Sequence, residues 1–214
     1  MLQGLRILRG YYLRCAVSLL SVAMLGLGAC ALTEEHINLG YTPTAEANKV
    51  TGAEDVTVTV AVQDQRTSPD HVGHKTNGYG MEMAKIVADN DVPTMLRQAL
   101  ETELTNRGFH IGPGSVAVNV TLQKFENHFE LGWFSGTARS ELIMGVIVVS
   151  PTGVTVFTKY VKGDGVNDSV QIAGGNNAKI ALEAAMQDAI KKLFEDQAFL
   201  KSLVEAGKMS AKNS

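Results

Sequence analysis

The order of hydrophobic periodicities along residues 55–206 constrains the fold of this chain more than any other feature. Residues 55–63 (DVTVTVAVQ) alternate strictly between valine and smaller or polar residues, which is typical of a half-buried strand. Apolar residues of the stretch 92–107 then recur at helical spacing. Because the helix follows a strand and precedes another, the pattern favours a parallel, right-handed crossover.

The predicted helix 92–107 carries start and stop signals at both ends. Asp91 is a plausible N-cap, and Pro93 falls in the first turn, where its missing N–H costs nothing. Gly108 follows the last helical residue, where a left-handed C-terminal residue is common. The boundaries of this helix are therefore well defined by sequence.

The second half of the domain repeats strand patterns and ends in helices. Strands are expected at 116–122, 137–149 and 154–161, close enough in sequence for an antiparallel meander. An amphipathic helix is expected over 177–194, and a shorter one over roughly 196–206.

The element order β-α-β-β-β-α indicates an α+β fold. We expect a mixed, mainly antiparallel four-stranded sheet with two helices packed on one face, plus the short C-terminal helix. The Gly- and polar-rich stretches 67–80 and 163–176 are predicted to be loops. A short strand over 83–87 is a weaker expectation, and the tail 207–214 is expected to fray.

The N-terminus has the three parts of a secretory leader. Three arginines and no acidic residue precede the apolar run 15–27, which is too short for a comfortable membrane span. Small residues, Gly28 and Ala29, then lead into Cys30. This Leu-Gly-Ala-Cys arrangement resembles the lipobox of bacterial lipoproteins, which implies cleavage between Ala29 and Cys30 and acylation of the Cys30 thiol. The alternatives are an uncleaved signal anchor and a secreted protein with a coincidental cysteine.

These boundaries divide the chain into four parts. Residues 1–29 are the leader, 30–54 the acylated cysteine and a tether, 55–206 one α+β domain, and 207–214 the tail. The only cysteines are Cys15 and Cys30, so the mature domain has no disulfide or cysteine metal site. Loss of the three leader arginines takes the formal net charge from −3 to −6, which argues against nucleic acid as a partner.

Two polar clusters are candidate sites. Asp64 and Arg66 follow the first strand and could form a binding pair, with a strand-end turn as the simpler interpretation. His71 and His74 lie beside Asp70 in one loop and are weak candidates for zinc or copper, since no third ligand lies nearby. No cofactor is expected.

An aromatic group is the best candidate for an interaction surface. Its members are Phe125, Phe129, Trp133 and Phe134. At an exposed hairpin tip these rings could dock a protein or touch the bilayer. The alternative interpretation is that they close one end of the core.

No catalytic motif is present in the sequence. There is no phosphate-binding loop, no dinucleotide fingerprint, no nucleophile elbow and no Ser-x-x-Lys. We therefore expect a protein that is not an enzyme, and rank a periplasmic hydrolase lowest.

Several motifs together resemble the YajG-type lipoproteins of Gram-negative bacteria. The resemblance rests on the lipobox, the Asp64-Gln65-Arg66 strand end, the 104–109 stretch (LTNRGF), Val118-Asn119-Val120 and Asn176-Asn177. It implies no activity and no cofactor. In such lipoproteins a residue other than Asp after the cysteine, here Ala31, favours the outer membrane. The expectation is an outer-membrane lipoprotein facing the periplasm, held by its N-terminal lipid, whose domain binds an envelope protein. The alternative is an accessory of lipid or lipopolysaccharide transport that binds acyl chains.

Overall fold

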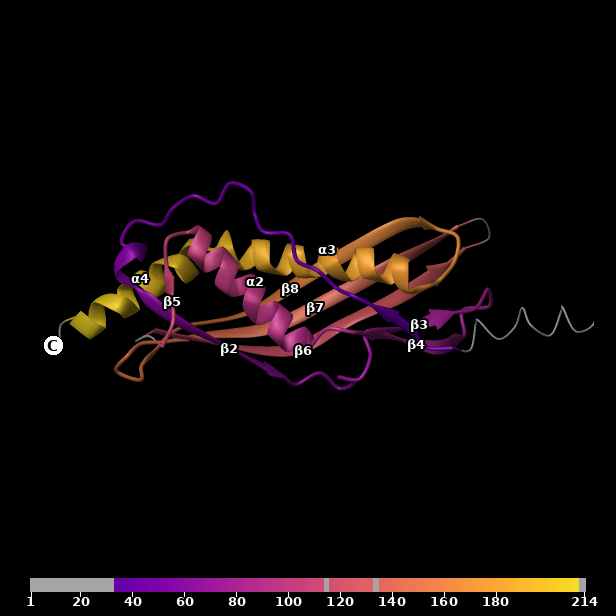
Figure 1. Ribbon diagram of the computed structural model, residues 1–214, viewed down its shortest axis with the longest axis horizontal. Helices are drawn as coiled ribbons and strands as arrows, with labels where there is room; N and C mark the ends of the chain where they lie inside the picture. Colours follow the sequence, from indigo (N-terminus) through magenta and orange to yellow (C-terminus); the bar gives the residue numbers. More distant parts are fainter. Residues whose placement is uncertain (1–32, 114–115, 133–134, 212–214) are drawn as a thin grey trace, which may run out of the picture.

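The computed structural model describes residues 33–113, 116–132 and 135–211, and shows a mixed sheet with helices over one face (Figure 1). Within those residues the sheet has eight strands. The strands are β1 Glu35–Ile37, β2 Thr57–Asp64, β3 Gly73–Thr76, β4 Glu82–Ala88, β5 His110–Ile111, β6 Val116–Leu131, β7 Gly136–Val149 and β8 Thr155–Val170. The helices are the 3-10 turn η2 Ala53–Asp55 and the α-helices α2 Val92–Asn106, α3 Gly175–Phe194 and α4 Gln197–Ala211.

The long strand β6 organises the sheet. One of its edges is shared by two strands in succession: β2 runs parallel to its first half, ending at the pair Asp64↔Leu122, and β3 begins further along at Gly73↔Asn127. The other edge pairs with β7, and β7 pairs with β8, both antiparallel. The predicted parallel crossover and antiparallel meander are therefore confirmed.

On the edge of β6 that β2 and β3 share, the sheet continues as two separate, short groups of strands. β5 adds to β2, whereas β4 and then β1 add to β3. This arrangement contradicts the predicted four-stranded sheet with two packed helices and a short C-terminal helix, because the sheet of the described residues has eight strands and the C-terminal helix α4 is 15 residues long. The weaker expectation of a strand over 83–87 is confirmed by β4, whereas β1, β3 and β5 were not predicted, and β3 lies in the stretch 67–80 that was expected to be a loop. These three strands are two to four residues long, too short to produce a strong alternating pattern.

Two strands extend further than predicted. In each of them the alternation of apolar residues, from which the strand was predicted, is interrupted before the strand ends. In β6 the register shifts between Leu122 and Lys124, and this bulge moves the buried positions from the even-numbered residues to Phe125 and Phe129. In β8 the continuation past Val161 places Gly163 and Gly165 at inward positions, so the sequence resembles a loop.

Those two glycines explain how α3 lies so close to the sheet. A Cβ atom at Gly163 would stand 2.1 Å from the carbonyl oxygen of Ala185, and one at Gly165 would stand 1.9 Å from that of Ala181. The helix faces β8 with buried alanines at this contact. Helix and strand backbones therefore meet with no side chain larger than a methyl group between them.

Helix α2 begins and ends as its sequence predicts. The Asp91 carboxylate accepts a hydrogen bond from the Thr94 N–H at 2.9 Å, and Gly108 has a φ of 101° just beyond the helix. Its apolar stripe, which includes Leu96, Leu100 and Leu104, is buried against β2 and β5.

The C-terminal helix is longer than expected. α4 continues through Gly207 to Ala211, where the sequence predicted a frayed tail. Gly207 is close to Val56, since a Cβ atom there would lie 2.7 Å from the Val56 side chain. The absence of a side chain at Gly207 thus permits packing against the start of β2.

The segment before β2, assigned by sequence to a tether, lies on the domain in the structure. Its strand β1 pairs with β4, and Ile37 and Leu39 are buried. The Tyr41 hydroxyl donates to the Glu103 carboxylate at 2.7 Å, and that carboxylate also accepts from the Thr44 N–H at 2.8 Å. Residues 35–55 are therefore part of the folded unit.

Several predicted features fall outside the described residues. They are the leader, the cleavage position at Ala29, the acylation site Cys30, and the aromatic residues Trp133 and Phe134. In the part of the chain that is described, no helix is both long and apolar enough to cross a membrane.

Candidate functional site

The predicted Asp64–Arg66 pair forms where β2 leaves the edge of β6. Arg66 donates from Nε to Asp64 Oδ1 at 3.0 Å and from Nη2 to Oδ2 at 2.8 Å, which makes a two-point contact. The Arg66 backbone N–H also donates to Oδ1, and Nη2 reaches the Pro69 carbonyl oxygen. The turn interpretation and the pairing interpretation therefore describe the same structure.

The electrostatics of the pair follow from burial and contact. Burial alone would raise the pKa of the Asp64 carboxyl, but the hydrogen bonds and charge of Arg66 hold it below its ordinary value. The Arg66 side chain is only 5% exposed. Its Nη1 atom is buried and has no hydrogen-bond partner among the described residues. A buried donor of a charged group without an acceptor is unfavourable, so this atom is suited to an incoming acceptor.

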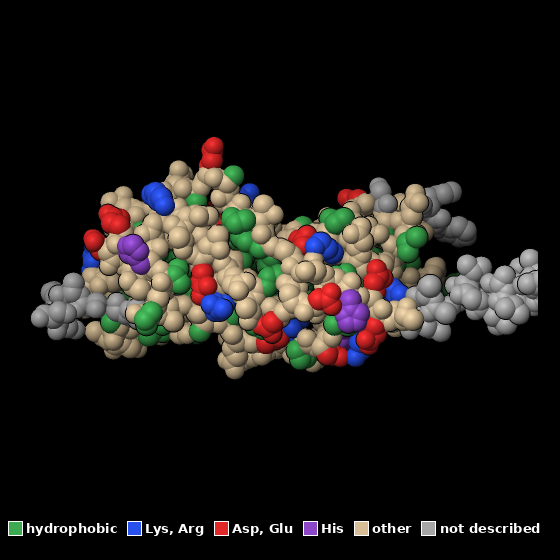
Figure 2. Space-filling view, viewed as in Figure 1, with side chains coloured by type: hydrophobic (Ala, Val, Ile, Leu, Met, Phe, Trp, Pro, Cys, Tyr) green, Lys and Arg blue, Asp and Glu red, His purple; other side chains and the backbone are tan. Residues whose placement is uncertain are grey.

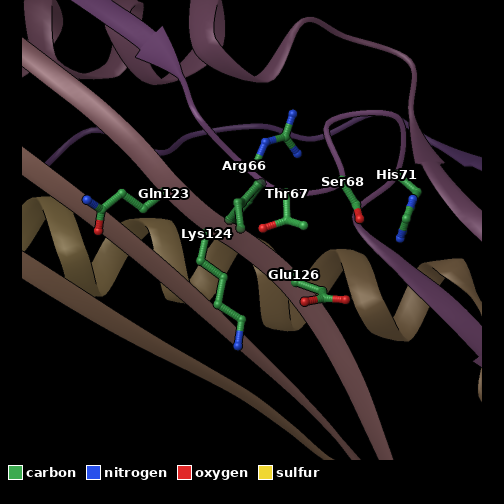
Figure 3. A pocket seen from close by; sticks show the side chains of 8 residues that line it. Arg66, Thr67, Ser68, His71, Gln123, Lys124 and Glu126 are labelled. Atoms are coloured by element: carbon green, nitrogen blue, oxygen red, sulfur yellow. The ribbon is translucent and has the colours of Figure 1, made fainter.

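A small cavity lies beside Arg66 at a gap in the sheet. Between Leu122 and Asn127, no described strand pairs with β6 on this edge, because β2 has ended and β3 has not begun. The cavity measures about 160 Å³ and is lined by Arg66, Thr67, Ser68, His71, Gln123, Lys124, Phe125 and Glu126. Figure 3 shows the first four on the connecting loop, with Lys124 and Glu126 extending from β6 away from the Arg66 guanidinium.

A second hollow of about 400 Å³ lies on the other side of Arg66, at the start of α2. It is lined mainly by acidic and small side chains, namely Asp64, Arg66, Pro69, Asp70, His71, Val72, Ala88, Asp89, Asn90, Asp91, Val92 and Pro93. All four carboxylates are already engaged, Asp64 by Arg66, Asp70 by Lys85 and His71, Asp89 by His36 and Asp91 by the helix N-terminus. This hollow therefore offers no carboxylate without a partner.

The two histidines of the loop are close together. Their rings lie 4.5 Å apart between centroids, and His71 Nδ1 is 2.9 Å from Asp70 Oδ1. Hydrogen bonds from Lys85 and then from His71 lower the pKa of Asp70 to about 2. No group of three or more metal-ligating side chains exists among the described residues, so the arrangement gives no support to a metal site.

The aromatic group divides in the structure. Phe125 and Phe129 are 2% and 3% exposed and lie in the core. This burial agrees with the core-closing alternative for these two rings. Phe125 also lines the small cavity from β6, where it supplies the apolar wall.

Sequence reasoning missed the hydroxyls and the unpaired donor. Thr67 and Ser68 carried no motif, and their place in the cavity depends on the loop leaving and rejoining the same edge of β6. These groups are suited to binding a ligand. A buried guanidinium donor beside two hydroxyls can donate hydrogen bonds to a carbonyl or carboxylate oxygen. Within the described residues, no hydrogen bond joins Ser68 to His71 as a nucleophile–base pair would require.

Comparison with known proteins places this domain among the lipoproteins of bacteria. The chain belongs to a family described as "Uncharacterized lipoprotein", whose model matches residues 43–203. The match begins in the segment before β2 and ends in α4, so it includes strands β2 to β8, helices α2 and α3, the first half of α4 and the Arg66 site, but not β1. No curated protein matches the chain.

Solved structures support the fold. Protein XCC0632 from Xanthomonas campestris is 13% identical with a TM-score of 0.53, covering 84% of this chain and 99% of that one. A minor lipoprotein from Acinetobacter baumannii is 8% identical with a TM-score of 0.41, covering 66% and 90%. Lipoprotein GNA1162 from Neisseria meningitidis is 10% identical with a TM-score of 0.31, covering 74% and 99%. Only the first similarity is strong enough to indicate a shared fold.

Proposed function

We propose that this chain is a non-enzymatic, YajG-type lipoprotein of the outer membrane whose periplasmic domain binds a segment of an envelope protein at the Arg66 cavity. The signal peptide is removed before Cys30, and the mature cysteine carries palmitate or a similar acyl chain. Membership of a lipoprotein family and the Leu-Gly-Ala-Cys sequence support the anchor. Ala31 in place of Asp supports the outer membrane.

One observation supports the binding role above all others. Arg66 is a buried cation whose Nη1 donor has no acceptor among the described residues, and it stands where none of the described strands pairs with the edge of β6 between β2 and β3. A peptide carbonyl, or the carboxylate of a side chain or chain end, would accept a hydrogen bond from Nη1 of the guanidinium. An extended segment suits this place because strand edges bind peptides through their backbones.

The alternative role in carrying acyl chains has less support. Such a carrier needs an apolar cavity between helices and sheet, but α3 lies directly on β8 at Gly163 and Gly165. A wider hollow of about 770 Å³ is an open groove between residues 44–51 and α4. Charged side chains such as Lys49, Lys201 and Lys208 line it along with apolar ones.

Photocrosslinking in cells tests the binding role. A photoreactive amino acid replaces the exposed Thr67 in the full chain, and Thr152, in the turn between β7 and β8, serves as the control position. We expect a protein adduct from position 67 and none from position 152. In an Arg66→Lys background the adduct should be lost, because lysine keeps the charge but not the two-point fork.

The crosslink also has a clear contrary outcome. An adduct that persists unchanged with Arg66→Lys would show that the guanidinium does not hold the partner. The absence of any adduct from a folded, membrane-attached protein would equally contradict the proposed binding role. Circular dichroism of each purified variant separates loss of binding from loss of fold.

A further inference from the structure

The chain between the acylation site and the folded domain is very short. Residues 35–55 pack on the domain, so at most the five steps from Glu35 back to Cys30 join the two. Five residues span at most about 17 Å when fully extended. With the lipid in the bilayer, the end of the domain that holds Glu35 has to lie close to the membrane surface.

Two connections surround Glu35 at that end of the molecule. The loop before α3 is one, since a Cβ atom at Gly174 would lie 3.3 Å from the Glu35 carboxylate. The β3–β4 hairpin is the other, because Glu35 pairs with Ile86 and its carboxylate lies 4.0 Å from Lys75 Nζ. Figure 1 shows both at the same end of the sheet, far from the C-terminus.

These two connections expose large apolar side chains to solvent. Tyr79 is 91% exposed and Met81 is 57% exposed in the β3–β4 turn, and Ile172 is 76% exposed in the loop before α3. The turn lies five residues before Ile86 along β4, about 17 Å at the rise of a strand. That distance equals the reach of the tether, so the turn and the anchor can meet the same surface.

We propose that this membrane-proximal tip, formed by Tyr79, Met81 and Ile172, inserts into the headgroup region of the lipid bilayer that holds the acyl chains. The proposal rests on the proposed lipid anchor. A tyrosine ring with a polar hydroxyl suits the membrane interface, and Met and Ile side chains suit its apolar side. Charges of both signs are mixed over the face in Figure 2, so the contact is apolar and does not depend on anionic lipid.

The tip orients the domain on the membrane. The β7–β8 turn and the end of α4 lie at the opposite end of the sheet (Figure 1), which in this orientation is the end away from the membrane. Two contacts with the bilayer, the lipid and the tip, fix the direction of the long axis in a way that one flexible anchor does not. The Arg66 cavity then opens to the side, between the two ends.

Depth-dependent quenching tests the tip. The acylated full-length protein is reconstituted into phosphatidylcholine vesicles that contain doxyl-labelled lipid, with Tyr79→Cys carrying an environment-sensitive fluorophore. The matched control is Thr152→Cys in the exposed β7–β8 turn. Because the lipid occupies Cys30 and Cys15 leaves with the leader, each variant has one reactive thiol.

We expect emission from position 79 to be blue-shifted and strongly quenched, and emission from position 152 to be neither. Adding Met81→Ser and Ile172→Ser should reduce the quenching at position 79 without releasing the protein from vesicles. Equal, weak quenching at both positions, on protein that floats with the vesicles, would contradict the insertion of the tip and leave the lipid anchor supported. A protein partner would then be the group that covers these three side chains. Protein that carries no lipid and does not float would instead overturn the proposed anchor.

Discussion

At the scale of single residues, Asp64 compensates the charge of the buried Arg66 side chain. The Arg66 side chain is 5% exposed and that of Asp64 is 20% exposed, and the Arg66 guanidinium and backbone N–H both donate to the Asp64 carboxylate. Breaking a buried ion pair by removing one partner leaves the other charge uncompensated. The pair is therefore a structural element as well as the proposed site.

We predict that Asp64→Asn lowers the free energy of unfolding by about 3 kcal/mol, the size typical of breaking a buried ion pair. The matched control is Glu195→Gln, which breaks the well-exposed contact with Lys191 and should cost less than about 0.5 kcal/mol. Urea denaturation of both variants measures the difference. Equal effects of the two substitutions would contradict the buried role of Asp64.

Asp64 and Glu103 are two of the carboxyls that couple stability to pH. Burial alone would raise the pKa of Glu103, but hydrogen bonds from Thr44, Arg107 and Tyr41 bring it below its ordinary value, and the pKa of Asp64 is lowered in the same direction. The folded state thus binds these protons more weakly than the unfolded state, so stability is fully present above the ordinary values, near pH 4, and is lost as the pH falls below them.

We predict that the free energy of unfolding decreases as the pH falls from about 5 to 3, the range in which unfolded carboxyls bind protons. The double variant Asp64→Asn and Glu103→Gln should be less stable at neutral pH and should respond less to acid. Urea titrations at several pH values measure both effects. A variant as sensitive to acid as the natural chain would show that other groups control the response.

At the scale of elements, the contact between α3 and β8 sets how the helical layer lies on the sheet. A Cβ atom at Gly165 would lie 1.9 Å from the Ala181 carbonyl oxygen, which is backbone and has to move as a unit with the helix. Gly78, in the β3–β4 turn, has no atom within 4 Å of such a position.

We predict that Gly165→Ala lowers the free energy of unfolding by about 2 kcal/mol or more, as overpacking of a tight core does. Gly78→Ala should change it by less than about 0.5 kcal/mol, the usual range for an open surface position. Thermal unfolding followed by circular dichroism compares the two. A harmless Gly165→Ala would mean that α3 stands further from β8 than described.

The same contact shows why sequence predicted only part of the sheet. The β2 alternation and the α2 caps were predictable because each depends on neighbours in the chain. The end of β8 was not, because its inward glycines serve a helix that comes later in sequence. The bulge in β6 similarly changed which residues face inward.

The sequence also predicted only part of the candidate site. Asp64 and Arg66 were identified from their position after a strand, and their pairing is local. The unpartnered Nη1 and the hydroxyls of Thr67 and Ser68 depend on the gap between β2 and β3 on β6. β3 is a four-residue strand with glycine and lysine, so the sequence did not predict the gap.

At the scale of the whole molecule, we propose a domain that its lipid holds close to a membrane by one end. The family match and the leader sequence support the lipid, the packing of residues 35–55 shortens the tether, and Arg66 lies part-way along the sheet. The binding site and the membrane tip both depend on the lipid for their orientation.

Metabolic labelling of cells with a palmitate analogue tests that central claim most directly. The full chain and its Cys30→Ala variant are expressed side by side, purified and assayed for the label, with membrane fractionation of each. The account predicts that the full chain carries the label and fractionates with the outer membrane, and that Cys30→Ala carries none. Label that persists in Cys30→Ala, or a full chain that never acquires it, would contradict the account.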